Sequence, residues 1–411
     1  MEKEVNIPTL RFPEFEGGWE KKKLGDEISE SGYGPRFSGE DYNINGNVKT
    51  IRGTDIALDG EILYDQVPIA YLNEEFIKNH ILEDGDLVMI TTADCGLTGV
   101  FRKQNIHFIA SAYAVKLRLK NTSNPDYFKY LFQTTIAFNQ VSKFIRKATI
   151  GNLPGSDILK FEFNLPSHPE QQKIASFLTA VDDKLQCLKK KKSLLEQYKK
   201  GVMQKLFSQE LRFNDDDGSD FPEWDVKKLG ELFHSEKGKG ISKNKVSENG
   251  KYECVLYGEL YTKYNEVIFE IVSKTSEIDG INSKIGDLLI PSSTTTTGID
   301  LANVTALNKD NVLLGGDITV LRSKQKINNV FYAYYLSNHK KEEIASYAQG
   351  STIVHLYYSH IKDMIIDIPS IKEQTKIANF ISAIDEKINY IQDQIEKMDL
   401  WKKGLLQKMF V

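Results

Sequence analysis

Residues 292–297 are six consecutive serines and threonines, and their hydroxyls form a dense group of hydrogen-bonding side chains in the sequence. Serine and threonine hydroxyls can contact both the bases and the backbone of a nucleic acid. The run follows a predicted strand that begins at Gly286-Asp287-Leu288. A second Gly-Asp-Leu strand begins at Gly85 and is followed by Thr91-Thr92-Ala93-Asp94. The matched positions predict a polar contact surface at the end of each strand.

Basic and aromatic residues of nearby polar loops extend this candidate surface. Arginine and lysine suit phosphates and guanine edges, although for any one of these residues an ordinary solvated loop is an equally good interpretation. The predicted DNA-binding residues are Tyr33, Arg36, Lys49, Arg52, Thr91, Thr92, Asp94, Arg146, Lys147, Thr149, Lys237, Lys239, Lys243, Ser292, Ser293, Thr294, Thr295, Thr296, Ser351 and Thr352.

Catalytic motifs are weak by comparison. The nearest match to the Asp/Asn-Pro-Pro-aromatic motif of an amino-methyltransferase is Asn124-Pro125-Asp126-Tyr127, which lacks the second proline and a glycine-rich cofactor loop upstream. Asparagine followed by proline is typical of a helix start, so we expect a cap there. No phosphate-binding loop of the form Gly-x-x-x-x-Gly-Lys-Ser/Thr occurs. We therefore predict no catalytic residue.

Metal-binding patterns are also weak. Asp215-Asp216-Asp217 lies in a Gly/Asp-rich segment and is better explained as a solvated linker. His355 and His360 are five residues apart and show no ligand pairing, while the three cysteines share no metal-ligand spacing. We predict no metal site, no cofactor bound by this chain, and free thiols in a reducing cytoplasm.

The composition is that of a globular protein. The chain has 411 residues, of which 40% are hydrophobic and 27% charged. This length predicts two or more domains. No signal peptide or membrane-length apolar run is present, so we expect a cytoplasmic protein without membrane contact. The net charge of −4 means that any neutralisation of DNA phosphates must be local or supplied by partners.

One stretch of the chain occurs twice and organises the rest. Residues 165–207 align without a gap to residues 368–410, at an offset of 203, and 17 of the 43 positions are identical. Shorter motifs recur at similar offsets, including Leu10-Arg11-Phe12 at Leu211-Arg212-Phe213. The chain is therefore two half-molecules of about 205 residues. Because the second helix would continue into residue 10 if the chain were circular, we expect the two ends to lie close together.

The repeated stretches predict two long helices with a coiled-coil seam. Apolar residues recur every seven positions in two tracks, which is typical of coiled coils; two ordinary amphipathic helices are the alternative. About 40 residues would give a helix of about 60 Å. The predicted seam consists of Ile174, Leu178, Val181, Leu185, Leu188, Leu195 and Val202 with Ile377, Ile381, Ile384, Ile388, Ile391, Ile395, Met398 and Leu405.

Lysines interrupt this seam. Lys192, Lys199 and Lys402 occupy seam positions, and since burying a lysine is costly we expect the seam to loosen there or the side chains to reach out to water. The first helix also carries a basic stretch, Lys189–Lys192 with Lys199, Lys200 and Lys205, which can contact phosphates or a partner, although a solvated helix face is favoured. A pseudo-twofold axis relating the halves makes the two helices antiparallel.

The remaining sequence predicts two mixed, strand-rich regions. Short β-rich segments, such as residues 86–92, 112–119, 287–291 and 317–322, are bounded by turn-forming residues. Helices are expected at residues 125–142 and 329–348. The predicted class is α+β, with domain 1 at residues 1–165, a first spacer helix at 166–210, domain 2 at 211–367 and a second spacer helix at 368–411.

Three features together resemble the specificity subunit of type I restriction–modification complexes. They are the segment RFPEFEGGWEKKKLGD, the alternation of a variable half with a long helix, and the pattern P-x-x-x-E-Q-x-K-I-A-x-F at Pro166 and again at Pro369. The segment KGKGISKNKV, from Lys237 to Val246, followed by YGEL, also resembles the start of one recognition-domain type. The resemblance covers nearly the whole chain.

The resemblance implies that each variable domain reads one half of a bipartite site in double-stranded DNA. The helices would form an antiparallel spacer that sets the distance between half-sites. Two modification subunits carrying S-adenosylmethionine would dock on the chain, and restriction subunits using ATP and Mg would join them. The chain itself would be non-catalytic. The main alternative is a coiled-coil adaptor whose variable regions bind protein, and a self-contained methyltransferase is a distant third.

Overall fold

The computed structural model describes residues 6–146 and 150–411. It divides into two compact units. Unit 1 comprises the chain up to Lys190 together with Asp393–Val411, and unit 2 comprises Lys191–Gln392. Each unit therefore combines one variable domain with parts of both long helices, α6 (His168–Phe207) and α13 (Ile371–Met409).

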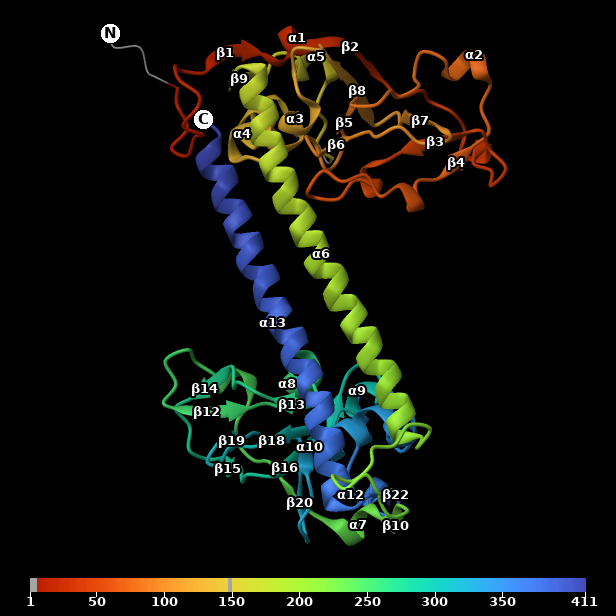
Figure 1. Ribbon diagram of the computed structural model, residues 1–411, viewed down its shortest axis with the longest axis vertical. Coiled ribbons are helices and arrows are strands. Elements are labelled where there is room, and N and C mark those ends of the chain that lie inside the picture. The colour runs from red at the N-terminus through yellow and green to blue at the C-terminus, as the bar shows by residue number, and fades with distance from the viewer. Residues whose placement is uncertain (1–5, 147–149) are drawn as a thin grey trace. The chain divides into compact units, whose positions relative to one another are not determined.

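Unit 1 is built on a four-stranded antiparallel sheet, ordered β2-β8-β5-β6, beside a three-stranded sheet, ordered β4-β3-β7. Strands β1 and β9 form a separate pair. Figure 1 shows these elements in red to yellow. The elements are β1 (Glu20–Lys23), α1 (Leu24–Glu27), β2 (Ile28–Tyr33), η1 (Gly39–Asp41), β3 (Val48–Ile51), η2 (Gly53–Asp55), η3 (Tyr64–Gln66), β4 (Ile69–Ala70), α2 (Glu74–Ile77), β5 (Leu87–Ile90), β6 (Thr98–Val100), β7 (His107–Ala110), β8 (Ala114–Leu119), α3 (Pro125–Leu131), α4 (Thr135–Phe144), α5 (Gly155–Ile158) and β9 (Glu162–Leu165).

Unit 2 repeats this plan, and each of its two sheets has one strand more. The sheets are ordered β11-β20-β16-β18-β13 and β14-β12-β19-β15, and β10-β22 and β17-β21 form separate pairs. The elements are β10 (Asp225–Lys228), α7 (Leu229–Leu232), β11 (Phe233–Lys237), η4 (Lys243–Lys245), β12 (Tyr252–Val255), α8 (Glu259–Thr262), β13 (Val267–Ile268), β14 (Ser273–Thr275), β15 (Ile281–Asn282), β16 (Asp287–Pro291), β17 (Ser293–Thr294), α9 (Gly298–Leu301), β18 (Thr305–Leu307), β19 (Leu313–Leu314), β20 (Ile318–Ser323), α10 (Asn329–Tyr334), the π-helical turn η5 (Tyr335–His339), α11 (Lys341–Ser346), β21 (Val354–His355), α12 (Tyr358–Ile361) and β22 (Ile365–Ile368).

The predicted α+β class and the four predicted strands are confirmed, but the two predicted domain helices are not continuous. Residues 125–142 form α3 and α4, because the Thr134 hydroxyl accepts from Ala137 N and starts a new helix. Residues 329–348 are interrupted by the π-helical turn η5. The expected cap is confirmed, since the Asn124 side chain accepts from Tyr127 N with Pro125 in the first turn.

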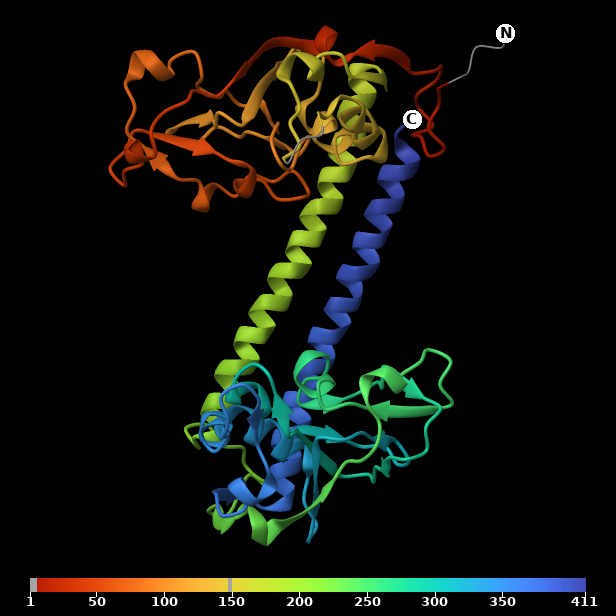
Figure 2. The same ribbon diagram turned by 180° about the vertical axis from the view of Figure 1, so that it is seen from behind.

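The two long helices are antiparallel in both units. In unit 1 the start of α6 shares a buried cluster with the end of α13, and in unit 2 the end of α6 shares one with the start of α13. Within each unit, Figure 2 shows the two helices running in opposite chain directions. Among the seam residues, Leu195, Val202 and Met398 are half-buried, and the others are buried: Ile174, Leu178, Val181, Leu185, Leu188, Ile377, Ile381, Ile384, Ile388, Ile391, Ile395 and Leu405.

The expectation for the seam lysines is wrong at two positions. Lys199 and Lys402 are only 11% and 10% exposed. Each amine pairs with a carboxylate of the other long helix, Asp385 at 2.8 Å and Asp182 at 2.6 Å. Burial is tolerated because each charge keeps an ionic partner. Lys192 lies closer to water, with 30% of its side chain exposed beside Glu196.

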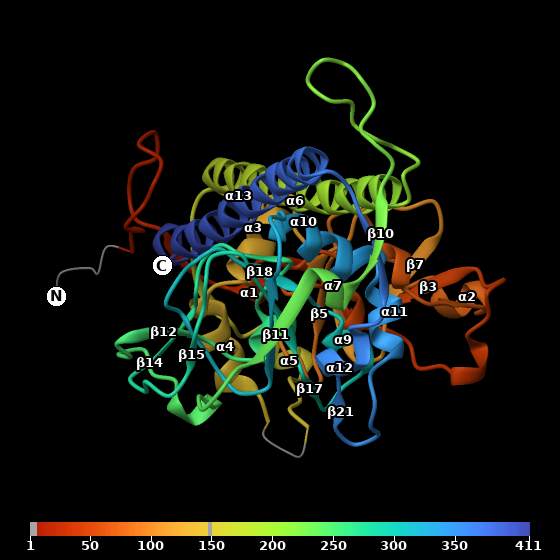
Figure 3. The same cartoon turned by 90° about the horizontal axis from the view of Figure 1, so that it is seen from below.

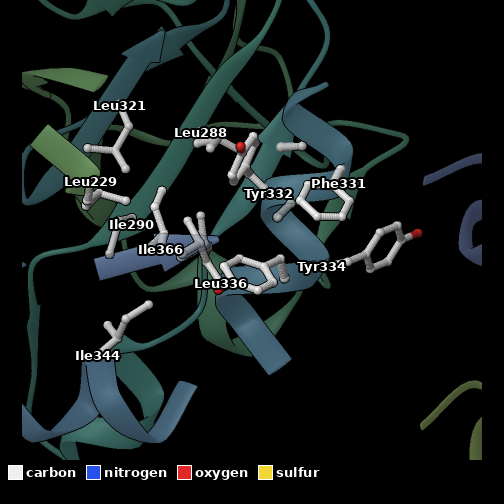
Figure 4. Close-up of a cluster of buried hydrophobic side chains, with 14 of the residues drawn as sticks. Leu229, Leu288, Ile290, Leu321, Phe331, Tyr332, Tyr334, Leu336, Ile344 and Ile366 are labelled. Carbon is white, nitrogen blue, oxygen red and sulfur yellow. The ribbon is translucent and has the colours of Figure 1, made fainter. Parts of the chain in front are cut away.

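Hydrogen bonds and apolar packing anchor domain 2 to the long helix α13. In unit 2 the buried Glu373 carboxylate accepts from Arg212 and from Trp224 Nε1. Figure 4 shows the adjoining core, in which Tyr334 points away from the other labelled side chains; its hydroxyl donates to Asp385 of α13. The domain core is thus tied to α13 by both apolar packing and hydrogen bonds.

The two ends of the described chain meet in unit 1, as the circular repeat predicts. Leu10 N donates to Lys408 O at 2.9 Å. The Phe410 ring is buried against Trp19 and Tyr127, with ring centroids 6.4 and 5.3 Å away. The segment before β1 therefore continues from the end of α13 much as Leu211-Arg212-Phe213 continues from α6.

Candidate nucleic-acid interface

The candidate interface of domain 1 lies where one end of its main sheet meets the bridge between Arg146 and Asn152. Strand β2 ends at Tyr33, β5 ends just before Thr91, and β8 begins just after Tyr113. These three ends meet because β8 runs antiparallel to both neighbours. Thr91 N donates to Tyr113 O at 2.9 Å. We call this group, Tyr33, Thr91–Asp94, Tyr113, Arg146 and Asn152, the domain 1 rim.

Several domain 1 candidates are brought together on this rim. The Tyr33 hydroxyl, on a side chain that is 43% exposed, accepts from Gly155 N at 2.7 Å. Thr92 bridges to Asn152, which in turn pairs with Arg146. The Arg146 guanidinium is 73% exposed and lies 3.8 Å from Asp157. Thr91, by contrast, is buried, and its hydroxyl donates to Tyr113 O.

The other domain 1 candidates lie away from the rim or are already paired. The Lys49 amine donates to Tyr64 O at 2.9 Å. The hydrogen bond from Arg52 to Asp55 raises the pKa of Arg52 and keeps the guanidinium in a fixed pair. Arg36 is exposed, and no ion pair holds it within the described part of domain 1. Lys147 and Thr149 lie outside the described residues.

The candidate interface of domain 2 occupies the corresponding end of the second sheet. Strand β17, which contains Ser293 and Thr294, pairs with β21; Figure 3 shows these strands near α12. Lys237 ends β11, and its amine lies 3.8 Å from Asp317 and 5.9 Å from the centre of the Tyr357 ring. We call this group, Lys237, Ser292–Thr295, Asp317, Gln349, His355 and Tyr357, the domain 2 rim.

The hydroxyl run serves mainly to hold this rim in shape. Ser292 and Thr294 are buried; their hydroxyls bond to those of Thr319 and Thr296, at 2.8 and 2.7 Å. Ser293 donates to Asp317 at 3.0 Å. The hydrogen bonds from Thr296 and Thr297 lower the pKa of Asp300, which caps α9. Thr295 is exposed and free to contact a ligand.

The remaining domain 2 candidates are exposed. Lys239 pairs with Asp279 at 2.8 Å, and this hydrogen bond raises the pKa of Lys239. Lys243 lies in η4 without an ion pair in the described part of domain 2. Ser351 and Thr352 lie between the bridged residues Gln349 and His355, at the edge of the rim.

Sequence reasoning missed six rim residues: Tyr113 and Asn152 in domain 1, and Asp317, Gln349, His355 and Tyr357 in domain 2. Tyr113 is 63% exposed, and the His355 ring stacks on Tyr357 with centroids 5.5 Å apart. A histidine and an aromatic two residues apart carry no signal by themselves. Tyr113 and Asp317 could have been found from the repeat, since each stands directly before the repeated β8 or β20 strand.

The comparison with known families accounts for the duplicated arrangement. The family model described as the type I restriction modification DNA specificity domain matches this chain twice, at residues 16–197 and 222–398. The chain belongs to this family. The two matches cover both variable domains and most of both long helices, so the two halves are two copies of the specificity domain.

Two relatives of known name span nearly the whole chain, and a third matches about half of it. The type I restriction enzyme MjaIX specificity subunit of Methanocaldococcus jannaschii is 24% identical over 414 residues, covering 95% of this chain and 92% of the relative. The MjaVIII specificity subunit of the same organism is 25% identical and covers 97% and 92%. A putative type I specificity subunit of Mycoplasma pneumoniae matches 46% of this chain at 26% identity.

Solved structures show that the specificity-domain fold is shared. The type I restriction–modification S subunit from M. genitalium matches with a TM-score of 0.61 and 17% identity, covering 98% of this chain and 99% of that one. A chain from a study of complex assembly and conformational transition in the type I system gives a TM-score of 0.56 at 16% identity. These likenesses confirm the predicted architecture of two recognition domains and two long helices.

Two further findings concern membranes and metals. Within residues 6–146 and 150–411, no helix is both long and apolar enough to cross a membrane. Over the same residues, no cluster of three or more histidine, cysteine, aspartate or glutamate side chains is placed to hold a metal ion.

Proposed function

We propose that this chain is the DNA sequence-recognition subunit of a type I restriction–modification complex, and that each variable domain reads one half of a bipartite site. The observation that carries the proposal is that a specificity domain occurs twice, each time with a polar rim at the same end of its sheet. Two rims on one chain fit two half-sites better than a single continuous target.

The long helices would set the spacing between the half-sites. They contain 40 and 39 residues, which corresponds to about 60 Å of helix at about 1.5 Å per residue. An insertion of a few residues near Ser193 should change the number of unread base pairs but not the half-sites. A methylated motif with unchanged spacing would remove the spacer role.

Partners would supply the chemistry. In this proposal two modification subunits carry S-adenosylmethionine, and restriction subunits use ATP and Mg. Each half offers a partly exposed aromatic group near the long helices: Phe12, Phe177 and Trp401 in unit 1, and Phe213 with Phe380 in unit 2. Trp401 is 48% exposed. Exposed aromatic anchors suit protein interfaces, and their duplication fits two copies of one partner.

Methylation sequencing tests the proposal directly. Genomic DNA from cells expressing this chain with its modification subunit should carry adenine methylation at one bipartite motif. A gel shift with mixed-sequence duplex DNA, with and without the modification subunit, then separates DNA recognition from the adaptor alternative. If neither assay shows sequence-dependent binding or methylation, the chain is not a DNA-recognition subunit.

A further inference from the structure

The two rims are supported by the same backbone hydrogen bonds. Thr91 N donates to Tyr113 O at 2.9 Å in domain 1, and Ser292 N donates to Asp317 O at 2.8 Å in domain 2. Tyr113 and Asp317 therefore occupy the same place, although one side chain is an exposed aromatic and the other a carboxylate. A second matched pair of bonds joins Leu153 N to Thr91 O and Leu356 N to Ser292 O.

A second position is fixed by the bridge that closes each rim. Arg146 and Asn152 exchange two backbone hydrogen bonds in domain 1, and Gln349 and His355 exchange the same two in domain 2. Asn152 also bridges to Thr92, as His355 pairs with Ser293. Asn152 and His355 are thus structurally equivalent.

The third position is the last residue of the first sheet strand. Tyr33 lies opposite Val115 in the β2–β8 ladder, and Lys237 lies opposite Thr319 in the β11–β20 ladder. The next residue in each case is a glycine whose N–H donates to β8 or its counterpart β20, at 3.2 and 2.8 Å. An uncharged aromatic in one domain is replaced by a cation in the other.

Two ion pairs of the framework, by contrast, have the same residue types in both domains. An arginine of the last sheet strand binds the aspartate of the Gly-Asp-Leu turn in both domains, and an arginine binds a buried glutamate of each long helix. These pairs are Arg118–Asp86, Arg322–Asp287, Arg11–Glu170 and Arg212–Glu373. The side-chain chemistry changes at the rim while the backbone hydrogen bonds named above are kept, as expected of positions that select a ligand.

We propose that half-site choice rests on three matched rim positions, and that in domain 2 Lys237 and Asp317 together read a G·C base pair. This inference rests on the proposed function. The three positions are Tyr33, Tyr113 and Asn152 in domain 1, and Lys237, Asp317 and His355 in domain 2.

The chemistry of the domain 2 positions fits this base pair. The Lys237 amine and an Asp317 carboxylate oxygen lie 3.8 Å apart, on side chains that are 65% and 46% exposed. In the major groove a lysine donates to guanine O6 or N7, and an aspartate accepts from the cytosine amino group. A donor beside an acceptor matches both edges of one G·C pair. Domain 1 has no such charged pair, because tyrosines stand at both positions.

Neighbouring side chains hold the pair in place. Ser293 donates to Asp317 at 3.0 Å, and the Lys237 amine lies over the Tyr357 ring. The His355 ring stacks on the same tyrosine, with Nδ1 3.1 Å from the Tyr357 hydroxyl. The lysine and the aspartate are therefore oriented before DNA arrives, which favours selectivity over simple phosphate attraction.

The test is methylation sequencing with Lys237→Ala and Asp317→Asn, each expressed with the modification subunit. Both variants should lose discrimination at the same G·C pair of one half-site by about tenfold to a hundredfold, as expected for loss of one base contact. The other half-site and the remaining positions of this half-site should be unchanged, and continued recognition of those remaining positions shows that domain 2 is folded. Lys326→Ala, which removes an exposed lysine beyond the opposite end of β20, is the matched control and should leave the motif intact.

Three results would decide against the inference in different ways. If neither half-site of the wild-type motif requires a G·C pair, the base assignment fails. If both variants keep the wild-type motif, the rim positions do not select DNA, although the chain still recognises it. If the wild-type chain directs no sequence-specific methylation at all, the proposed function fails and this inference fails with it.

Discussion

The same helix pair carries opposite charge balances in the two halves. In unit 1 the Lys402–Asp182 pair is joined by Lys129, 3.9 Å from Asp182, which gives two cations and one anion. In unit 2 the Lys199–Asp385 pair is joined by Glu266, 3.0 Å from Lys199, which gives one cation and two anions. A tyrosine hydroxyl, of Tyr130 or Tyr334, donates to the aspartate in each half.

The difference lies entirely on the domain side. The lysine and the aspartate of each pair come from the long helices. The two lysines are 203 residues apart (402 − 199), and so are the two aspartates (385 − 182), which is the offset of the repeat. The third charged residue comes from the variable domain. Glu266 and Lys129 thus adapt different domains to one helix pair. The comparison shows that the repeated helices keep a fixed ionic pair and that each domain completes it in its own way.

The pKa values in unit 2 reflect this crowding of acids. Burial opposes the charge of Lys199, but Glu266 and Asp385 outweigh burial and raise the pKa of Lys199. Burial likewise opposes the ionisation of Glu266, yet the charge of Lys199 lowers its pKa. Burial dominates at Asp385 and raises its pKa. The ammonium of Lys199 is therefore the one charge of this trio that offsets the negative charges of both Glu266 and Asp385.

The largest expected effect comes from removing that cation. Lys199→Met leaves the largely buried carboxylates of Glu266 and Asp385 without their shared cation and should destabilise unit 2 by about 3–5 kcal/mol. Lys402→Met leaves Asp182 beside Lys129 and should cost unit 1 only about 1–3 kcal/mol. Urea unfolding followed by ¹⁹F NMR of 5-fluorotryptophan separates the units, because Trp224 lies in unit 2 and Trp19 and Trp401 lie in unit 1.

A second substitution sharpens this comparison. Adding Glu266→Gln to Lys199→Met removes the extra anion and should recover part of the lost stability of unit 2. Equal losses for the two single methionine variants, or no recovery in the double variant, would mean that the domain-side charge has no part in the balance.

The next effect should be equal in the two halves. Glu170 and Glu373 are buried, and each accepts from an arginine and from a tryptophan indole. Substitution of either by glutamine weakens hydrogen bonds to a charged group and should cost about 1.5–3 kcal/mol in its own unit. The same ¹⁹F resonances report the loss. Glu14→Gln, at an exposed pair with Lys173, is the control and should leave both units unchanged.

Sequence reasoning reached the repeat, the helices and the family because these depend on periodicity and offset. It placed Lys199 on the seam but not its partners, because Glu266 is far away in sequence and meets the lysine only after domain 2 has folded. It placed Tyr33 and Lys237 in corresponding groups of loop residues, and only the two strand ladders show that they are one position. The hydroxyl run suggested contacts with a ligand, but side chains of the same domain, such as Thr319, Asp317 and Asp300, occupy most of those hydroxyls.

A smaller effect is expected from the hydroxyls of domain 2. Thr294 and Thr295 correspond to Ala93 and Asp94 in domain 1, so domain 1 has no hydroxyl side chain at these two positions. Thr294→Ala with Thr295→Ala should weaken DNA binding by up to about tenfold, or about 1.4 kcal/mol, and should affect only the half-site read by domain 2. Gel-shift titration of the complex on its methylation motif measures this. Unchanged affinity and unchanged sequence choice would remove these residues from the interface.

The smallest effect should be a pH dependence confined to unit 2. Burial, together with the neighbouring charge of Lys340, lowers the pKa of His339 below its ordinary 6.5. The unfolded chain therefore takes up a proton below pH 6.5 that the folded chain resists, so the stability of unit 2 should fall as pH falls through this range. The position 204 residues earlier is Thr135, which does not titrate, so this contribution is missing from unit 1.

His339→Phe tests this point while keeping an aromatic ring at the position. The His339 ring stacks on Tyr335, with centroids 5.4 Å apart, and phenylalanine can preserve that packing. In urea unfolding at pH 5.5 and 7.5, the Trp224 resonance should report a smaller difference between the two pH values in the variant than in the wild type. An undiminished difference would assign the pH response to another group of unit 2, and would leave the helix–domain charge clusters as the main physical distinction between the halves.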